Sequence, residues 1–280
     1  MSAVYTSSDG QRAIQERYRE LLAGWPVPAE HRRVPTREGE TFVLVSGPPD
    51  APALVLLHGS GSNALMWAPD VAAWSAHFRV HAVDLIGEPG LSAPARPPLT
   101  SGAYPLWFDD VLDGLGFARA SVVGVSLGGW LTLDHATRHP ERVERLVLLT
   151  PAGLARPKVA GLLAAAALKP FGEWGERKSL EVFLGPEVRR QTGSAEFVRL
   201  VSRHFRYRRE PVPVIEDAAL RRLDLPVLAI LGGQDAFIHS PRSADRLSRL
   251  VPTADIRVLP AVGHLLPAQT EPVLEFLRTT

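Results

Sequence analysis

The chain has 280 residues, of which 45% are hydrophobic, enough to bury the core of one large domain or of one domain that carries an insertion. It contains no cysteine, so disulfides, thiolate metal sites and a cysteine nucleophile are all excluded. The 31 basic and 30 acidic residues give a formal net charge of +1, which provides no overall field to attract nucleic acid or an anionic membrane. We therefore expect a small-molecule partner, with no nucleic acid and no membrane.

The amino terminus lacks a basic start followed by a long apolar segment, so it does not resemble a signal peptide. The longest apolar segment, VAGLLAAAALKPF at residues 159–171, is shorter than the roughly 20 apolar residues needed to cross a bilayer. These features predict a soluble, cytoplasmic protein. The sequence gives no indication of its oligomeric state.

The first predicted elements are a helix at residues 11–22 and two strands, RRVPT and TFVLVSG, joined by the turn REGE. Next, APALVLLHGSGSN places an all-apolar run before a glycine-containing loop, and the helical pattern ALMWAPDVAAWSAHF follows. Three later stretches repeat this order, FRVHAVDLIGEPG with a helix at residues 104–115, ASVVGVSLGGW, and VERLVLLTPAG. The alternation predicts an α/β fold with a mostly parallel sheet, helices on both faces and an antiparallel edge.

The pattern changes over residues 154–222, where helix-prone stretches and prolines occur without a convincing apolar strand. We interpret this segment as an inserted helical cap, with residues 160–168 as the roof over the site. Strand and helix alternate again from LPVLAILGGQD to a last helix at residues 270–278. The predicted core therefore combines residues 1–153 and 223–280.

One serine, Ser126, lies between Gly124 and Gly128 in ASVVGVSLGGW, where an apolar strand pattern gives way to a helical one. This spacing matches G-x-S-x-G, in which a sharp strand-to-helix turn exposes the serine and glycines remove side-chain clashes two residues to either side. The helix that follows directs its N–H groups and positive dipole end toward charge near the serine. The pattern favours a nucleophilic serine over a plain glycine-rich turn.

A serine hydroxyl is a weak nucleophile and needs a base, usually a histidine. His264 is the best of nine candidates, because it follows the strand ADIRVLP in a short loop at the sheet edge where Ser126 is expected. His135 and His139 fall on the helix after Ser126, and His58 precedes the glycine loop, so structural roles are favoured for them.

The histidine in turn needs a carboxylate that orients it. Asp235 ends the run LAILGGQD, at the carboxyl end of a predicted strand, and completes the chain order Ser, Asp, His. A turn or helix-capping role is the alternative for this aspartate. Asp84, at the end of FRVHAVD, is the other candidate acid, but it would break that chain order.

Attack on a carbonyl creates an oxyanion, which backbone N–H donors stabilise. The N–H of Leu127 is the first expected donor and that of Ser60, in the loop HGSGSN, is the second. The neighbouring Gly59 and Gly61 permit close backbone approach there. The loop lacks the lysine and spacing of a P-loop, and no G-x-G-x-x-G motif follows it, so a nucleotide site is not predicted.

Four motifs, HGSGSNALMW, DLIGEPGLS, GVSLGG and the pair GGQD with VGH, occur in an order and at distances that resemble the α/β-hydrolases of the capped esterase type, over nearly the whole chain. DLIGEPGLS, the amino-terminal helix and LVSGPPDAPALVLLHG are similar more narrowly to bacterial carboxylesterases of the naproxen-esterase kind. The resemblance implies Ser126 as nucleophile, His264 as base and Asp235 as acid, and implies that no cofactor or metal is required.

The favoured hypothesis is a serine hydrolase that cleaves small carboxylic esters through an acyl-enzyme. The same residues could act on a lactone, a thioester, an amide or a C–C bond next to a ketone, and the motifs do not separate these substrates. A third hypothesis is a ligand-binding protein with this fold and no turnover, because fold alone does not fix function.

Overall fold

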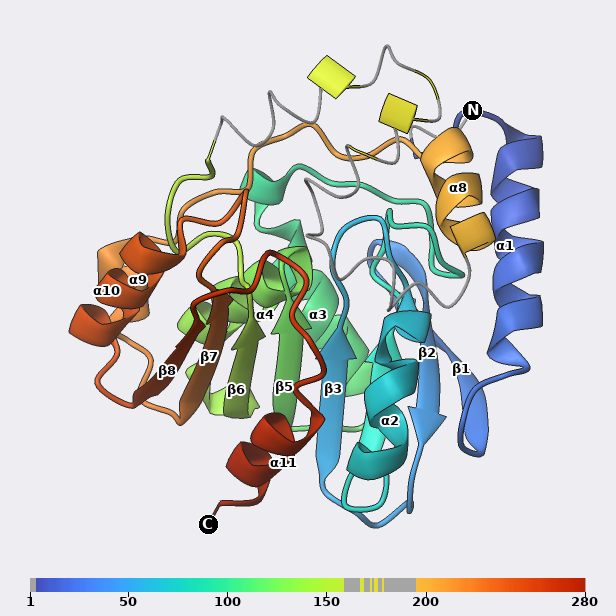
Figure 1. Ribbon diagram of the computed structural model, residues 1–280. Helices are drawn as coiled ribbons and strands as arrows, with labels where there is room; N and C mark the ends of the chain where they lie inside the picture. Colours follow the sequence, from blue (N-terminus) through green and yellow to red (C-terminus); the bar gives the residue numbers. More distant parts are fainter. Residues whose placement is uncertain are drawn as a thin grey trace.

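The structure of the protein, a computed structural model, describes residues 4–158 and 195–279, together with residues 167, 168, 172, 174, 175 and 178. Its centre is an eight-stranded sheet in the order β1-β2-β4-β3-β5-β6-β7-β8 (Figure 1). The strands are β1 (Ala29–Thr36), β2 (Gly39–Ser46), β3 (Ala53–Leu57), β4 (Arg79–Val83), β5 (Ala120–Val125), β6 (Val143–Leu149), β7 (Val227–Gly232) and β8 (Ala254–Leu259). β2 pairs antiparallel with β1 and with β4, and every other pairing is parallel. The predicted mostly parallel sheet with an antiparallel edge is confirmed.

The central strands are apolar throughout because helices cover both faces of the sheet. In β3, Val55 and Leu57 belong to one hydrophobic cluster and Leu54 and Leu56 to the other, as the two-residue period of a strand requires. One cluster joins the sheet to α3 (Ala103–Gly114), α4 (Leu127–Arg138), α9 (Asp217–Leu220) and α10 (Ser240–Leu250). The other joins it to α1 (Ser8–Leu22), α2 (Ala68–Trp74) and α11 (Thr270–Arg278). Figure 1 shows α2 and α11 in front of the sheet, and α3 and α4 behind it.

The predicted helix over residues 64–78 forms in two pieces, a 3-10 turn η1 (Ala64–Trp67) and then α2. Asn63 caps the first piece by accepting the N–H of Leu65. Pro69 lies in the first turn of α2, where its missing N–H costs no hydrogen bond. The proline therefore marks a new helix start rather than the interior of a longer helix.

The amino-terminal helix α1 packs beside α8 (Ala195–His204), a pairing visible on the right of Figure 1. The two share a small apolar cluster that includes Ile14 and Val201. One turn further along α1, the fully buried Tyr18 packs against the sheet residue Phe42, and its hydroxyl donates to Asp84 at 2.9 Å. The start of the chain is thus attached to both the sheet and α8.

The predicted cap, residues 154–222, is described only in part, and its boundaries stay a prediction. Its described elements are α8 and α9, and no strand element lies in the part of it that the structure describes. Most of the predicted roof, residues 160–168, lies outside the described residues. Among the described residues, no helix has the length and apolar character of a membrane span.

Candidate active site

Ser126 stands at the junction of β5 and α4 with backbone angles φ 51° and ψ −106°. This conformation is strained for a residue with a side chain, and surrounding hydrogen bonds hold it in place. Its N–H donates to Leu149 O at 3.0 Å, and its carbonyl accepts the N–H groups of Trp130 and Ala152 at 3.0 and 3.1 Å. Such a turn presents the serine hydroxyl at the carboxyl edge of the sheet.

The two glycines that flank the serine are required by close backbone contacts. A Cβ atom on Gly124 would lie 2.6 Å from Gly128 O, and one on Gly128 would lie 2.2 Å from Leu57 O. Both distances are too short for a carbon–oxygen contact, and rigid backbone atoms stand on the other side. The steric reason expected for the G-x-S-x-G spacing is therefore present in the structure.

Three side chains from three strand ends meet here. His264 Nε2 lies 3.0 Å from Ser126 Oγ, and His264 Nδ1 lies 2.6 Å from Asp235 Oδ2. The other carboxylate oxygen, Asp235 Oδ1, accepts the N–H groups of Phe237 and Ile238 at 2.7 and 2.8 Å. Because a carboxylate only accepts, the short contact assigns the imidazole proton to Nδ1 and leaves Nε2 able to accept from the serine hydroxyl.

The loop that carries His264 is fixed against two neighbouring strands. Gly232, at the end of β7, has no room for a side chain, since a Cβ atom there would lie 1.9 Å from Gly263 O. Thr150 Oγ1 donates to His264 O at 3.2 Å, and the Phe237 ring meets the imidazole edge-on with ring centroids 5.7 Å apart. These contacts hold the imidazole between the serine and the aspartate.

Asp84, the second candidate acid, is bound elsewhere. Its carboxylate accepts the Tyr18 hydroxyl and the N–H groups of Ala64 and Leu91 at 2.8 to 2.9 Å. Burial raises the pKa of Asp84 to about 6 despite these donors. None of these described partners of Asp84 is a predicted catalytic residue, and the carboxylate that contacts His264 is that of Asp235.

The loop after β3 lies directly against the serine. A Cβ atom on Gly59 would stand 3.6 Å from Ser126 Cβ, an ordinary contact. Crowding therefore does not require glycine at position 59. At Gly61 a side chain is disfavoured, because the residue has φ +71° and a Cβ atom there would lie 2.4 Å from the Tyr207 ring. The role expected for the two glycines, close backbone approach to a substrate, stays a prediction, and of the two only Gly61 has a backbone conformation that favours glycine.

His58 orients the peptide unit between Gly59 and Ser60. Its Nε2 accepts the Leu85 N–H at 2.9 Å, so its Nδ1 carries the proton that is shared with Gly59 O at 2.8 Å. Burial lowers the pKa of His58 to about 4, which keeps the ring neutral. The described chain has no cis peptide bond, so the Ser60 N–H points away from the Gly59 carbonyl that His58 holds.

The N–H groups of Ser60 and Leu127 make no hydrogen bond to any described residue. Leu127 is the first residue of α4, where N–H groups lack partners inside the helix. The remaining candidate histidine, His135, is fully buried with Nε2 2.8 Å from Asp109 Oδ1, which fits the structural role expected for it.

Glu88 is a residue of this region that sequence reasoning missed. It follows β4 in the loop DLIGEPGLS and is only 3% exposed. Its Oε2 accepts the Gly61 N–H at 2.6 Å and the Ser60 hydroxyl at 3.3 Å. Burial raises the pKa of Glu88 to about 7. The available signal was a charged residue just beyond an apolar strand, at the sheet edge where the other site residues were expected.

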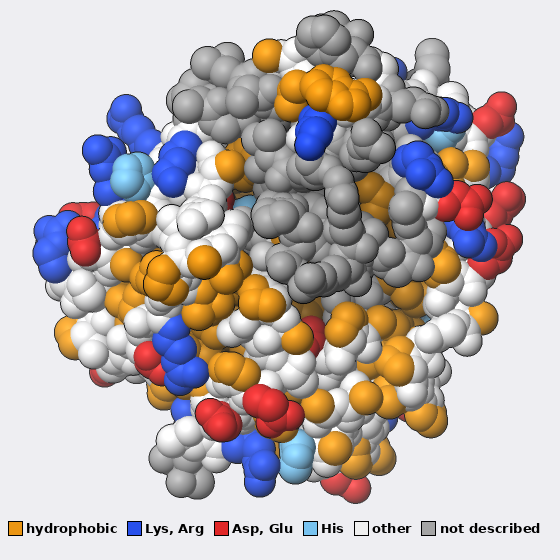
Figure 2. Space-filling model, viewed as in Figure 1, with side chains coloured by type: hydrophobic (Ala, Val, Ile, Leu, Met, Phe, Trp, Pro, Cys, Tyr) orange, Lys and Arg blue, Asp and Glu red, His pale blue; other side chains and the backbone are white. Residues whose placement is uncertain are grey.

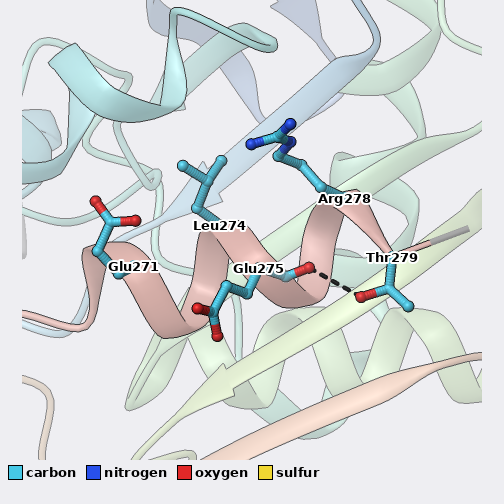
Figure 3. Close-up of a pocket in the computed structure, with 5 residues that line it drawn as sticks. All are labelled: Glu271, Leu274, Glu275, Arg278 and Thr279. Atoms are coloured by element: carbon cyan, nitrogen blue, oxygen red, sulfur yellow. Dashed lines mark hydrogen bonds between the residues drawn. The ribbon is translucent and has the colours of Figure 1, made fainter.

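Other surface features lie apart from these residues. A cavity of about 300 Å³ on α11 is lined by Glu271, Leu274, Glu275, Arg278 and Thr279 and contains none of the predicted site residues (Figure 3). Figure 2 shows acidic and basic side chains intermingled on the face viewed. Within the part of the chain that the structure describes, no group of three or more His, Asp or Glu side chains could hold a metal ion.

Comparisons with known proteins identify the family to which the chain belongs. The pattern of the alpha/beta hydrolase family matches residues 54–279. Carboxylesterase YbfK of Bacillus subtilis is 35% identical over 273 residues, which cover 93% of this chain and 92% of that protein. The crystal structure of naproxen esterase (carboxylesterase NP) from the same organism has a TM-score of 0.85 at 32% identity, and covers 97% of this chain and 99% of that one.

A more distant relative is the 2-hydroxymuconate semialdehyde hydrolase of Pseudomonas sp., 37% identical over 140 residues, which are 46% of this chain and 47% of that protein. The family pattern covers the chain from β3 to α11, including all three side chains that meet at the strand ends. The protein belongs to the alpha/beta hydrolase family.

Proposed function

We propose that the protein is a serine hydrolase that cleaves small carboxylic esters through an acyl-enzyme. The observation that carries the proposal is the hydrogen-bonded series from Ser126 through His264 to Asp235, with distances of 3.0 and 2.6 Å. The names of the relatives support ester cleavage, since YbfK and the naproxen esterase are both carboxylesterases aligned over more than nine-tenths of the chain.

In this mechanism Ser126 Oγ attacks the ester carbonyl while His264 Nε2 takes the hydroxyl proton. Asp235 stabilises the imidazolium that forms and keeps its ring in place. The imidazolium then donates its proton to the leaving alcohol as the acyl–oxygen bond breaks. Water repeats the sequence, giving a proton to His264 as it attacks the acyl-enzyme, and the serine recovers that proton when the acid leaves.

The carbonyl oxygen becomes negative at each attack and requires donors near Ser126. The Leu127 N–H opens α4 directly after the serine, and the Ser60 N–H is presented by the loop that lies against it. Neither N–H has another described partner, so each can donate to the oxyanion without first losing a hydrogen bond. The steps need no metal or cofactor.

The test compares Ser126→Ala with Ser121→Ala, which changes a buried serine on β5, the strand that leads to Ser126. A fluorophosphonate probe should label the wild type and Ser121→Ala but not Ser126→Ala, and kcat for p-nitrophenyl butyrate should fall by at least about 10³-fold only in Ser126→Ala. Labelling of Ser126→Ala at the wild-type rate would remove Ser126 as the nucleophile.

A second candidate is cleavage of a C–C bond next to a ketone. The 37% identity over 140 residues to the 2-hydroxymuconate semialdehyde hydrolase favours this chemistry over cleavage of a lactone, a thioester or an amide. A panel of esters, lactones, thioesters and vinylogous diketones at equal concentration separates the two candidate reactions. The ester proposal expects the highest kcat/KM for an ester, and a diketone turned over more efficiently than every ester would replace it.

A further inference from the structure

We propose that Glu88 is a positioning residue for catalysis, which fixes the loop of Ser60 so that its N–H is aimed at the oxyanion. This inference rests on the proposed serine hydrolase mechanism. It concerns a residue that does not touch the reacting atoms and acts through the peptide unit between Ser60 and Gly61 and through the Ser60 hydroxyl.

The loop is held from both sides of Ser60. On the amino-terminal side, His58 Nδ1 lies 2.8 Å from Gly59 O, and on the carboxyl-terminal side Glu88 Oε2 accepts the Gly61 N–H at 2.6 Å. The same carboxylate oxygen accepts the Ser60 hydroxyl at 3.3 Å. With both adjoining peptide units fixed, the Ser60 N–H loses its freedom to rotate. Rigid donors of this kind lower the cost of stabilising charge as it develops.

Tyr207 packs against Gly61 of the same loop. Its ring lies so close to Gly61 that a Cβ atom there would be 2.4 Å from Cε1. The Glu88 backbone is fixed as well, because its carbonyl accepts the Gly90 N–H at 2.8 Å and the Tyr5 hydroxyl at 3.4 Å. Glu88 is therefore a fixed support for the loop.

The carboxylate is aimed at the loop and not at the nearby guanidinium groups. Arg96 donates to the carbonyls of Gly87 and Arg206, and Arg208 donates to Pro97 O and Glu210. Among the described residues, no ion pair joins either arginine to Glu88. Burying a carboxylate without an ion-pair partner carries a desolvation cost. The hydrogen bonds from the Ser60 hydroxyl and the Gly61 N–H offset part of this desolvation cost.

The experiment compares Glu88→Ala, Glu88→Asp and Glu88→Gln with wild type in steady-state ester hydrolysis. The alanine variant loses both bonds and the aspartate is too short by one methylene, so kcat should fall by about 10- to 100-fold, less than the 10²- to 10³-fold typical of deleting an oxyanion donor. KM should stay within about 3-fold, because substrate binding before attack does not use the oxyanion. The glutamine carbonyl can still accept the Gly61 N–H, so Glu88→Gln should keep kcat within about 3-fold.

An alkyl trifluoromethyl ketone adds to the serine and places an oxyanion in the same site. Its inhibition constant should rise in Glu88→Ala in parallel with the loss of kcat. Tyr18→Phe serves as control, since it removes a buried hydrogen bond to Asp84 without touching Ser60 or Gly61, and should leave kcat and inhibition unchanged.

The two proposals fail in different ways. If Ser126→Ala is inactive but Glu88→Ala and Glu88→Asp keep kcat and inhibitor affinity within 2-fold of wild type, the positioning role is wrong and the serine mechanism stands. If Glu88→Ala does not fold, the comparison of kcat between Glu88→Asp and Glu88→Gln tests the inference. Equal kcat values in these two variants would overturn it. If Ser126→Ala remains active, the serine mechanism fails first.

Discussion

Replacing Glu88 with glutamine should make the stability of the protein less dependent on pH. Burial raises the pKa of Glu88 from its ordinary 4.5 to about 7, so the folded protein binds this proton more tightly than the unfolded chain does. The stability that this proton contributes is fully present below about pH 4.5 and is lost as the pH rises through about 7. Glutamine has no proton to lose.

The magnitude follows from the difference between the two pKa values. The two pKa values differ by about 2.5, and at about 1.4 kcal/mol for each tenfold change in proton affinity the total is about 3.5 kcal/mol, most of which is lost between about pH 5 and about pH 8. Asp84, whose pKa burial raises to about 6, titrates in the same range. Its contribution is the same in wild type and variant and cancels in the difference.

Urea unfolding of both proteins at about pH 5 and about pH 8 measures the effect. The free energy of unfolding of Glu88→Gln relative to wild type should rise by about 2 to 3 kcal/mol between these conditions. A relative stability that is equal at the two pH values would refute the reasoning, because it would mean that Glu88 titrates alike in the folded and unfolded states. Ser121→Ala, which changes a buried side chain that does not titrate, is the control.

Three further predictions concern the site. Gly128→Ala should lower the free energy of unfolding by about 1 to 3 kcal/mol through its clash with Leu57 O. Gly59→Ala should change the free energy of unfolding by less than about 0.5 kcal/mol but should lower kcat, because it places a methyl group beside Ser126. Equal losses of stability in urea unfolding of the two variants would contradict the contact distances. Asp235→Asn should stay folded but lose about 10³- to 10⁴-fold in kcat, since the amide can favour the wrong imidazole tautomer, and unchanged kinetics would exclude Asp235 as the orienting acid. Across p-nitrophenyl esters from acetate to palmitate, kcat/KM should peak at short or middle chain length, because each buried methylene adds about 0.8 kcal/mol only while the pocket has room, and a steady rise to palmitate would indicate a lipase.

The local sequence pattern was sufficient to predict the sharp strand-to-helix turn that carries Ser126. The apolar run before Ser126, the flanking glycines and the helical pattern after it are all contiguous in the sequence, and the structure has β5, a strained turn and α4 in their places. The choice between Asp235 and Asp84 used chain order alone, yet the contact to His264 is made by Asp235. Both aspartates end a strand at the same edge of the sheet, so local sequence did not separate them.

The break between η1 and α2 was missed because apolar periodicity continues across it. The pattern from residue 64 onward keeps one face apolar, as shown by the buried Trp67 and Trp74, while the change in helix type depends on Pro69. Proline in the first turn of a helix is tolerated, so it marks a boundary only when a preceding cap, here Asn63, is recognised.

Glu88 could not be assigned a role from the sequence because its partners depend on strand order. β3 and β4 are neighbours in the sheet, which brings the loop that follows β4 beside the loop that follows β3. The two buried carboxylates of DLIGEPGLS accept hydrogen bonds from different parts of the loop after β3. Asp84 accepts the Ala64 N–H where η1 begins, and Glu88 accepts the Gly61 N–H next to the proposed oxyanion donor. Two acidic residues four positions apart thus support both ends of the same short segment, and only the one near Ser60 is expected to affect the rate of reaction.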